Sequence, residues 1–306
     1  MQKRKQYTQV NGFWVVLVSL CLAQWGMAAR FEDAADSPYE NRRAMENKTA
    51  NNPYVLLPYK PNYAVYSYVL DPNNQAYEPV GLPPDGLDKS ELEFQLSLHF
   101  PLLGNRFEKT FDMSFAFTTH AFWQAFNNNI SAPFRETNYE PELIVSLRTP
   151  WTFLGLTNRS NSLILNHQSN GRYQTLSRSW NRLIAELVFE KGNYVTAFRP
   201  WYRLPEKAKT HPSDAKGDDN PDIQEYLGYF EWLNVYRVSQ QTFSLRFMNN
   251  GCSDVNRSTI DISYSIPVYG RLRAYAKYFN GYGRSLIDYN VRQNAFSLGL
   301  ALSDWL

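Results

Sequence analysis

Alternation of apolar and polar residues with a period of two is the feature that most constrains the fold of this chain. In residues 92–100, Leu or Phe at every even position alternates with Glu, Gln, Ser and His at the odd positions. Successive side chains of a β-strand point to opposite faces, so such a segment predicts a strand with one apolar face and one polar face. The pattern recurs in about twelve segments: residues 63–70, 92–100, 111–117, 139–147, 156–169, 180–189, 194–202, 226–235, 242–248, 259–266, 272–278 and 295–302.

The composition indicates where these apolar faces point. Aromatic residues make up 16% of the chain, although its mean hydropathy is −0.48. After the first 30 residues no apolar run approaches the roughly 20 residues that a membrane-spanning helix needs. A transmembrane barrel combines both properties, because its strands turn apolar side chains to lipid and polar ones inward. We therefore expect an all-β fold, a transmembrane antiparallel β-barrel of about 12 strands, an even number as single-chain barrels require.

The N-terminal region is divided by composition. Residues 1–29 have the layout of a secretory signal peptide, with basic residues 3–5, an apolar run at 13–22 and small residues at 26–29. A membrane-anchoring helix is the weaker alternative, because that apolar run is far too short to span a bilayer. Residues 30–61 are polar and aperiodic, and we interpret them as an irregular lead-in, periplasmic or plug-like. Residues 62–306 would form the barrel domain.

Charge and cysteine content exclude other arrangements. The formal net charge of +2 argues against a nucleic-acid partner, which would require basic residues concentrated on one face. Without the signal peptide, Cys252 is the only cysteine, so no internal disulfide can form. Arg271, Arg273 and Lys277 share one face of their segment. We expect these three side chains to point into the barrel and to pair with acidic residues of other strands.

A histidine and a serine stand two residues apart in the segment 156–169. His167 and Ser169 share the apolar face of the expected strand, and Asn181 shares the apolar face of the next one. All three would therefore lie on the outer wall of a membrane barrel. A serine hydroxyl is a weak nucleophile until an imidazole takes its proton and a third group holds the imidazole tautomer. Spacing alone leaves open a polar cluster at the barrel rim.

Longer motifs around these residues resemble those of the bacterial outer-membrane phospholipase A family. The similarity runs from about residue 63 to the C-terminus, with the motifs in the family's order. It implies a twelve-stranded barrel in the bacterial outer membrane that hydrolyses phospholipids and lysophospholipids on its outer wall. The motifs are PFRETNYEP at 133–141, NHQSNGR at 166–172, SRSWNR at 177–182, DDNPDI at 218–223, GYG at 281–283 and SLIDYN at 285–290.

The resemblance implies roles for the three polar residues and for a neighbouring glycine. Ser169 would be the nucleophile, His167 the general base, and Asn181 the residue that orients the imidazole. The backbone N–H of Gly171 would donate to the oxyanion of the tetrahedral intermediate. Glycine suits that position because it lets the backbone approach a ligand closely.

The resemblance also implies a calcium cofactor and a homodimer as the active form. Calcium prefers hard oxygen ligands, which here would be the Ser131 and Ser177 side chains and the Arg172 carbonyl. Ser131 would come from one subunit and the other two from its partner, so that calcium would link dimerisation to activity. The ion would assist the oxyanion through a coordinated water. Asp219 corresponds to an acidic residue associated with a second calcium position.

Two residues depart from the family pattern. Gln174 stands where the family has a carboxylate, and a neutral amide is a poorer calcium ligand, which weakens the case for the second calcium position. Thr119 stands where a glutamine marks the family's dimer interface, which leaves the strength of the dimer open.

Other functions fit parts of the sequence. The main alternative is a non-enzymatic barrel, either a pore or a structural envelope protein. A pore needs its functional residues inside, so outward-facing His167, Ser169 and Asn181 argue against it. A barrel acyltransferase would use the same nucleophile and pass the acyl group to an alcohol other than water. Positional preference for the ester, head-group choice and the activating trigger also stay open.

Overall fold

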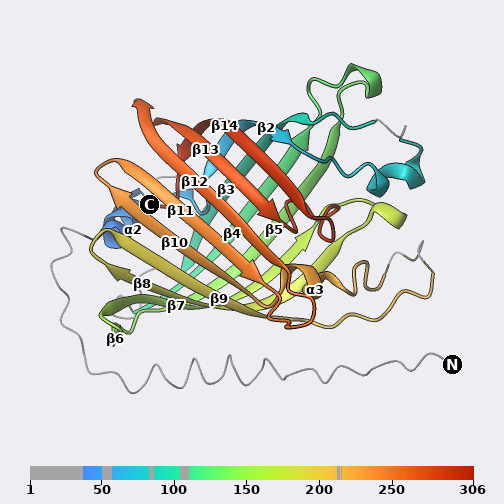
Figure 1. Ribbon diagram of the computed structural model, residues 1–306. Helices are drawn as coiled ribbons and strands as arrows, with labels where there is room; N and C mark the ends of the chain where they lie inside the picture. The colour runs from blue at the N-terminus through green and yellow to red at the C-terminus, as the bar shows by residue number, and fades with distance from the viewer. Residues whose placement is uncertain (1–36, 50–56, 83–85, 104–109, 212–213, 215) are drawn as a thin grey trace.

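The computed structural model describes residues 37–49, 57–82, 86–103, 110–211, 214 and 216–306. Within them, twelve antiparallel strands form a barrel that closes between β14 and β2 (Figure 1). Two-residue strands β1 (Leu57–Pro58) and β6 (Thr152–Phe153) add to β3 and β7. The barrel strands are β2 (Asn62–Val69), β3 (Ser90–Leu103), β4 (Phe111–Trp123), β5 (Phe134–Leu147), β7 (Leu156–Ser169), β8 (Ser179–Lys191), β9 (Tyr194–Arg203), β10 (Phe230–Val238), β11 (Gln241–Asn249), β12 (Ser258–Tyr269), β13 (Leu272–Gly281) and β14 (Gln293–Ser303).

The barrel prediction and its strand number are confirmed, although several strands are longer than predicted, such as β4 and β5. One boundary differs in kind. The segment predicted as a strand from 226 to 235 begins as strand only at Phe230, because helix α3 (Ile223–Leu227) precedes it. Gly228 ends this helix with a φ of 76°, and a Cβ there would overlap the carbonyl of Asn249. The positive φ at this glycine redirects the chain into β10.

The two faces of the barrel wall differ as the alternation predicts. In β7, Leu163 and Leu165 are 37% and 51% exposed, whereas Ile164 and Asn166 are 0% and 1% exposed. The exposed leucines face outward, where lipid would cover them, and the buried pair faces the interior. Among the described residues, no helix has the length and hydropathy needed to cross a bilayer.

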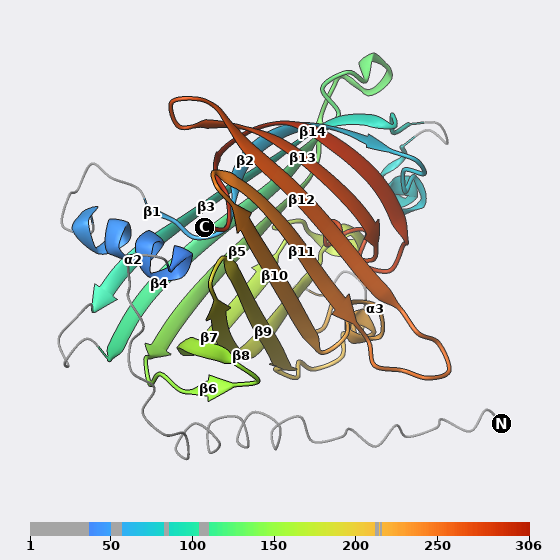
Figure 2. The same cartoon turned by 60° about the vertical axis from the view of Figure 1, so that its left-hand side comes forward.

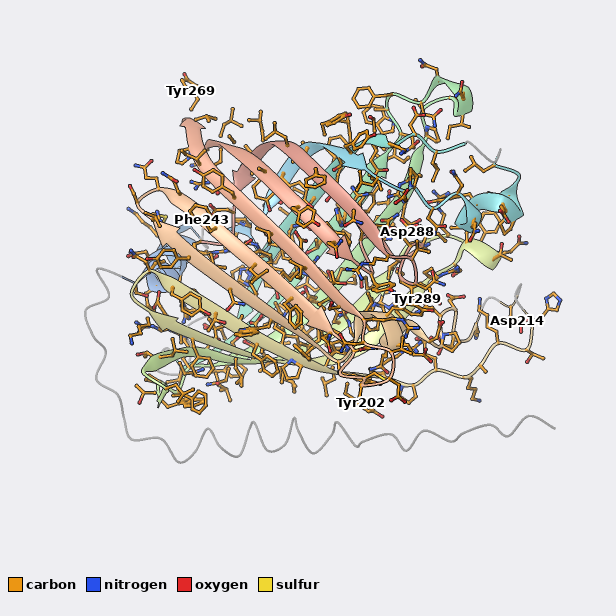
Figure 3. The ribbon with its side chains drawn as sticks, in the orientation of Figure 1. Tyr202, Asp214, Phe243, Tyr269, Asp288 and Tyr289 are labelled. Carbon is orange, nitrogen blue, oxygen red and sulfur yellow. The ribbon has the colours of Figure 1, made fainter. Side chains whose placement is uncertain are left out.

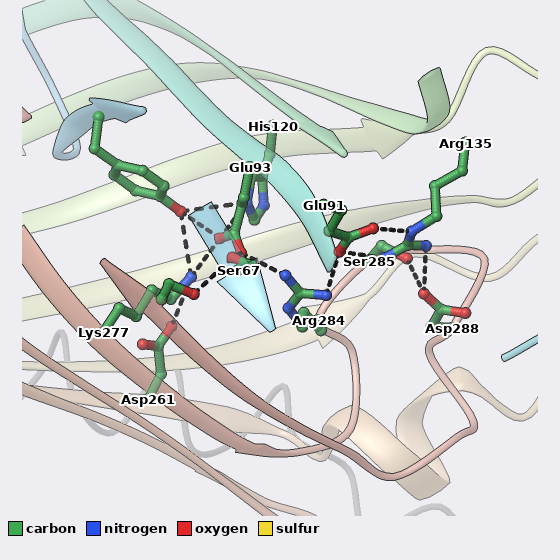
Figure 4. Close-up of polar contacts among 12 residues, drawn as sticks. Ser67, Glu91, Glu93, His120, Arg135, Asp261, Lys277, Arg284, Ser285 and Asp288 are labelled. Carbon is green, nitrogen blue, oxygen red and sulfur yellow. Dashed lines mark hydrogen bonds and ion pairs between the residues drawn. The ribbon is translucent and has the colours of Figure 1, made fainter. Parts of the chain in front are cut away.

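The interior is crossed by paired charges (Figure 4). The Arg284 guanidinium lies between two carboxylates, 2.6 Å from Glu91 and 2.6 Å from Glu93. Arg135 extends the chain of contacts, 2.6 Å from Glu91 and 2.8 Å from Asp288. A buried charge is costly unless it is paired and hydrogen-bonded, so each arginine requires its carboxylates. These ion pairs tie β3 and β5 to the connection between β13 and β14.

The basic residues of β13 are oriented largely as predicted. Lys277 points inward and lies 2.7 Å from Glu93, and Arg273 lies 3.0 Å from Asp304. Arg271 sits in the turn before the strand and is exposed. The expected inward pairing therefore holds for two of these three residues, since the third falls outside the wall.

The N-terminal lead-in is not wholly irregular. Residues 1–36, which include the predicted signal peptide, lie outside the described residues, but α2 (Pro38–Thr49) is helical and lies at one end of the barrel beside the C-terminus (Figure 2). Arg42 donates to the carbonyl oxygens of Trp305 and Pro58, at 2.5 and 2.8 Å. The Ser37 hydroxyl accepts from the backbone N–H of Glu40 at 3.0 Å and so caps the helix. No helical period indicated this helix, because it has no apolar stripe.

The two ends of the barrel differ in their connections. Tight turns follow β8, β10 and β12 at the end that carries α2, which we call the α2 end. Longer loops, with helix α3 and the short helices η2 (Gln75–Val80), η3 (Asn128–Ile130) and η4 (Gln174–Leu176), lie at the opposite end, which we call the loop end. Because β7 ends and β8 begins at the loop end, the predicted site residues lie there.

Candidate active site

Adjacent strands bring the three predicted catalytic residues together. His167 and Asn181 are cross-strand partners in β7 and β8, and Ser169 follows His167 on the same side of β7. All three are half-buried and share the outward face with Leu163 and Leu165. The structure thus places them on the outer wall, as the alternation indicated.

The imidazole of His167 is held by an amide. Its Nδ1 lies 2.8 Å from Oδ1 of Asn181. An amide oxygen only accepts, so Nδ1 carries the hydrogen and the lone pair is left on Nε2. Within the described residues no hydrogen bond joins Ser169 to His167, and such contacts often tighten only in the substrate complex. This tautomer can accept a proton from a hydroxyl at Nε2.

Gly171 lies in the loop that joins β7 to β8. Its φ of 63° is in the left-handed region, and a Cβ at this position would come within 3.3 Å of the Tyr139 ring. Only glycine adopts this conformation freely. Glycine at the predicted oxyanion position therefore suits both the positive φ of the backbone and the close approach of the Tyr139 ring.

Asn170 organises this loop, and the sequence analysis assigned it no role. Its side chain is 4% exposed. Its Oδ1 accepts from the backbone N–H groups of Arg172 and Arg178, at 3.2 and 2.9 Å, and its Nδ2 donates to the carbonyl of Leu176 at 2.8 Å. The sequence signal for this role is an asparagine next to a glycine in a turn, because an asparagine side chain can replace backbone hydrogen bonds there. It fixes the backbone around Gly171.

Ser177, one of the predicted calcium ligands, lies against Asp219. The Ser177 hydroxyl donates to Oδ2 of Asp219 at 2.7 Å, and the Ser179 hydroxyl donates to the same atom at 3.3 Å. The other carboxylate oxygen, Oδ1, forms an ion pair with the ammonium of Lys209. Both oxygens of Asp219 therefore have partners within this chain.

Ser131, the remaining predicted side-chain ligand, lies in the connection between β4 and β5. It is exposed, and both Ser131 and Ala132 have positive φ, at 58° and 47°. Two successive left-handed residues other than glycine are strained, and such strain concentrates at functional sites. No hydrogen bond of the described residues joins Ser131 to Arg172 or Ser177.

The two departures from the family pattern are also located. Gln174 opens η4 with a φ of 54°. Thr119 lies in β4, where its cross-strand partners are Leu96 of β3 and Tyr139 of β5. Its neighbour Thr118 is buried and faces inward, so Thr119 faces outward on the barrel wall. An outward position is the one that a residue of a dimer interface requires.

Asn181 has a second partner that the sequence did not reveal. Its Nδ2 donates to Oε1 of Glu206 at 3.1 Å. Glu206 lies in the polar connection between β9 and α3. A contact across 25 residues between a strand and an aperiodic loop has no periodic signature, so no sequence pattern could have indicated it.

Further polar contacts tie the loops of this end to one another. The Tyr289 hydroxyl donates to Asp222 at 2.5 Å, and burial, together with this hydrogen bond, raises the pKa of Tyr289 above its usual value. Asp288 accepts from Ser285 at 2.7 Å. Figure 3 shows Asp288 and Tyr289 at the loop end and Tyr269 at the opposite end. The site is thus supported by a connected group of loops.

Known proteins resemble the chain throughout its barrel. The model of one protein family, described as Phospholipase A1, matches residues 39–302. Phospholipase A1 of Klebsiella pneumoniae is 35% identical over 290 residues, covering 94% of this chain and 97% of that protein. Phospholipase A1 of Escherichia coli K12 is 33% identical over 297 residues, covering 96% and 98%.

Solved structures agree with the sequence comparison. The calcium-bound dimer of the Salmonella typhi outer membrane phospholipase has a TM-score of 0.76 at 36% identity, covering 84% of this chain and 95% of that chain. The Escherichia coli outer membrane phospholipase A has a TM-score of 0.75 at 35% identity over the same shares of the two chains. The similarity therefore includes the barrel wall on which His167 and Asn181 lie.

Proposed function

The chain belongs to the outer-membrane phospholipase A1 family, and from this premise we propose that it hydrolyses acyl esters of phospholipids and lysophospholipids with a Ser169–His167–Asn181 triad. The hydrogen bond of 2.8 Å between His167 and Asn181 carries the proposal. It orients an imidazole on the outer wall, in line with Ser169 and with the exposed leucines of β7. Acyl chains in the surrounding membrane would lie along those leucines.

The proposed reaction proceeds in two halves. The Ser169 hydroxyl attacks the ester carbonyl carbon while Nε2 of His167 takes its proton, and the Gly171 N–H donates to the oxyanion. The ester C–O bond breaks, the imidazolium returns the proton to the leaving lysophospholipid oxygen, and the acyl group stays on Ser169. Water, deprotonated by His167, then attacks the acyl-enzyme and releases the fatty acid, and Ser169 regains its proton.

The oxygen donors beside Gly171 fit a calcium ion. The Ser177 hydroxyl donates its hydrogen to Asp219, so the lone pairs of its oxygen remain available to a cation. Within the described residues, no group of three or more His, Cys, Asp or Glu is placed to hold a metal, and the proposed ligands are instead hydroxyl and carbonyl oxygens. When bound, calcium would supply positive charge next to the oxyanion. We propose Ser177 and the Arg172 carbonyl as ligands, with Ser131 of a second subunit.

Asp219 is better assigned a supporting role. Its two oxygens are engaged by Lys209, Ser177 and Ser179. A carboxylate that hydrogen-bonds a ligand orients it and tunes the site without touching the metal. We therefore propose Asp219 as the residue that orients Ser177.

The shared ligand set makes a homodimer the proposed active form. The division into a signal peptide at 1–29, a lead-in at 30–61 and the barrel domain at 62–306 belongs to the same proposal. The buried ion pairs of Glu91, Glu93 and Arg284 oppose the alternative of an open pore, which needs a wet and unobstructed interior.

The proposal is tested by identifying products. Refolded protein in detergent is mixed with one defined phospholipid in water enriched in ¹⁸O, with either calcium or a chelator. Hydrolysis predicts free fatty acid carrying one ¹⁸O in its carboxylate, together with lysophospholipid, in the calcium sample only. An acyl ester of an added alcohol as the main product would indicate a transferase, and absence of both products would refute the proposed activity.

A further inference from the structure

We propose that Glu206 is a positioning residue, which fixes the amide of Asn181 and through it the tautomer of His167. The inference rests on the proposed triad and extends it by one residue. Its basis is a chain of two hydrogen bonds. The amide oxygen of Asn181 accepts from Nδ1 of His167 at 2.8 Å, and its amide N–H donates to Oε1 of Glu206 at 3.1 Å.

The chemistry of the partner decides which way the amide of Asn181 faces. The oxygen and nitrogen ends of an amide are nearly equal in shape, so packing alone distinguishes them poorly. An ionised carboxylate accepts hydrogen bonds and donates none. Glu206 therefore requires the NH₂ end of Asn181 and leaves the oxygen end for His167.

The direction of the amide in turn sets the state of the base. An oxygen opposite Nδ1 of His167 stabilises the tautomer with hydrogen on Nδ1, which leaves Nε2 free to take the proton of Ser169. An amide turned by 180° would donate to Nδ1 and stabilise the opposite tautomer, in which Nε2 already carries hydrogen. Without Glu206, part of the enzyme would hold this inactive arrangement.

Glu206 also supplies a charge that an asparagine lacks. Proton transfer from Ser169 leaves His167 as an imidazolium, and a nearby negative charge favours that form. In a Ser-His-Asp triad the acidic member provides this charge directly. Here Asn181 would transmit it, since its amide lies between Glu206 and His167.

The segment that carries Glu206 is held against β8. The backbone N–H of Leu204 donates to the Asn181 carbonyl at 2.9 Å, and that of Asp218 donates to the Lys207 carbonyl at 2.8 Å. Gly217 makes this approach possible, because its φ is 118° and a Cβ there would lie 2.9 Å from the Lys207 oxygen. Glu206 is thus positioned before substrate binds, as a residue that maintains a tautomer must be.

The first test removes the charge and keeps the shape. Glu206→Gln can still accept from Asn181 but can also donate, so the amide loses its fixed direction. We expect kcat to fall about 3- to 30-fold with KM unchanged, less than the loss caused by removing the base itself. Glu225→Gln is the matched control, because Glu225 lies at the same end, is 64% exposed and pairs only loosely with Arg257 at 3.7 Å. The control should retain full activity.

A second test detects the tautomer directly. Protein labelled with ¹⁵N at its 4 histidines is examined by NMR above the pKa of the imidazole, and the His167 signal is identified by its absence in His167→Asn. Wild type should show Nδ1–H, and Glu206→Gln a mixture of both tautomers. A merely structural loss would not move this signal.

A third test exchanges the two functional groups. In the double variant Asn181→Asp/Glu206→Gln, a carboxylate faces His167 and an amide supports it, so the Nδ1–H tautomer is required again. This variant should be more active than Glu206→Gln alone. Wild-type activity and tautomer in Glu206→Gln, or no gain in the double variant, would overturn the inference. Ser169→Ala, assayed in parallel, separates this result from failure of the triad, because an active Ser169→Ala enzyme would refute the proposed function itself.

Discussion

His167 and Asn181 face each other across the β7–β8 pair, with Nδ1 of the imidazole 2.8 Å from the amide oxygen. Both residues belong to strands that are hydrogen-bonded to further strands on their other sides. The backbone of the barrel wall therefore fixes their separation, independently of the loops. Sites built on strands hold their geometry more precisely than sites on loops.

We expect Asn181→Ala to lower turnover severalfold to about a hundredfold while activity survives, because a neutral orienting group contributes less than the base. His167→Ala should cost considerably more. The comparison uses initial rates on one phospholipid, with heat-dependent gel mobility as the check that each barrel is folded. Equal and complete loss in both variants would show that the two roles are wrongly assigned.

Replacement of Gly171 should impair the oxyanion position. Gly171→Ala introduces a side chain at a φ of 63° and 3.3 Å from the Tyr139 ring, so the N–H moves. We expect kcat to fall about 10- to 100-fold, near the cost of losing one oxyanion donor. Gly192→Ala is the control, because Gly192 has a φ of 53° and open space around it, at the α2 end. Similar losses in both variants would attribute the effect to backbone strain alone.

Calcium and dimerisation should be thermodynamically linked if the ligands come from two subunits. Calcium should then raise the dimer fraction measured by sedimentation in detergent, and dimerisation should raise calcium affinity by the same factor. Ser177→Ala should weaken both effects together, whereas Ser253→Ala, in an exposed loop, should change neither. Full activity of a calcium-free monomer would contradict the shared site.

Lys209 should compete with calcium electrostatically. Its ammonium pairs with Asp219, whose other oxygen holds Ser177. Lys209→Gln leaves that carboxylate uncompensated, and a nearby negative charge favours a cation. We expect the calcium concentration for half-maximal dimerisation to fall severalfold, while the exposed Lys216→Gln serves as control. An unchanged or higher concentration would mean that Lys209 does not affect the calcium site.

The barrel was predictable because one physical rule repeats along the chain. Each wall strand separates lipid from interior, so its sequence alternates with period two. Helix α2 escaped prediction because it is polar on every side and is held by contacts such as Arg42 to the Trp305 carbonyl, 263 residues away. Helix α3 escaped prediction for another reason, because it is only 5 residues long and is separated from β10 by Gly228.

The triad was predictable in part. The parity of His167, Ser169 and Asn181 placed them on one outer face, and the structure confirms that placement. The partners of the site could not be foreseen in this way. Glu206 and Lys209 reach Asn181 and Asp219 from an aperiodic loop, whose fold is set by contacts with 217–219 rather than by any local pattern.

The most direct test of the account is the activity and labelling of Ser169→Ala. The substitution removes one hydroxyl from a half-buried outward position, so the barrel should stay folded by gel mobility and circular dichroism. The variant should release no fatty acid from phospholipid with calcium present. A serine-directed covalent inhibitor should label wild type at Ser169 alone, as mapped by mass spectrometry, and should not label the variant. Normal turnover by Ser169→Ala, or labelling of another residue with loss of activity, would contradict the account.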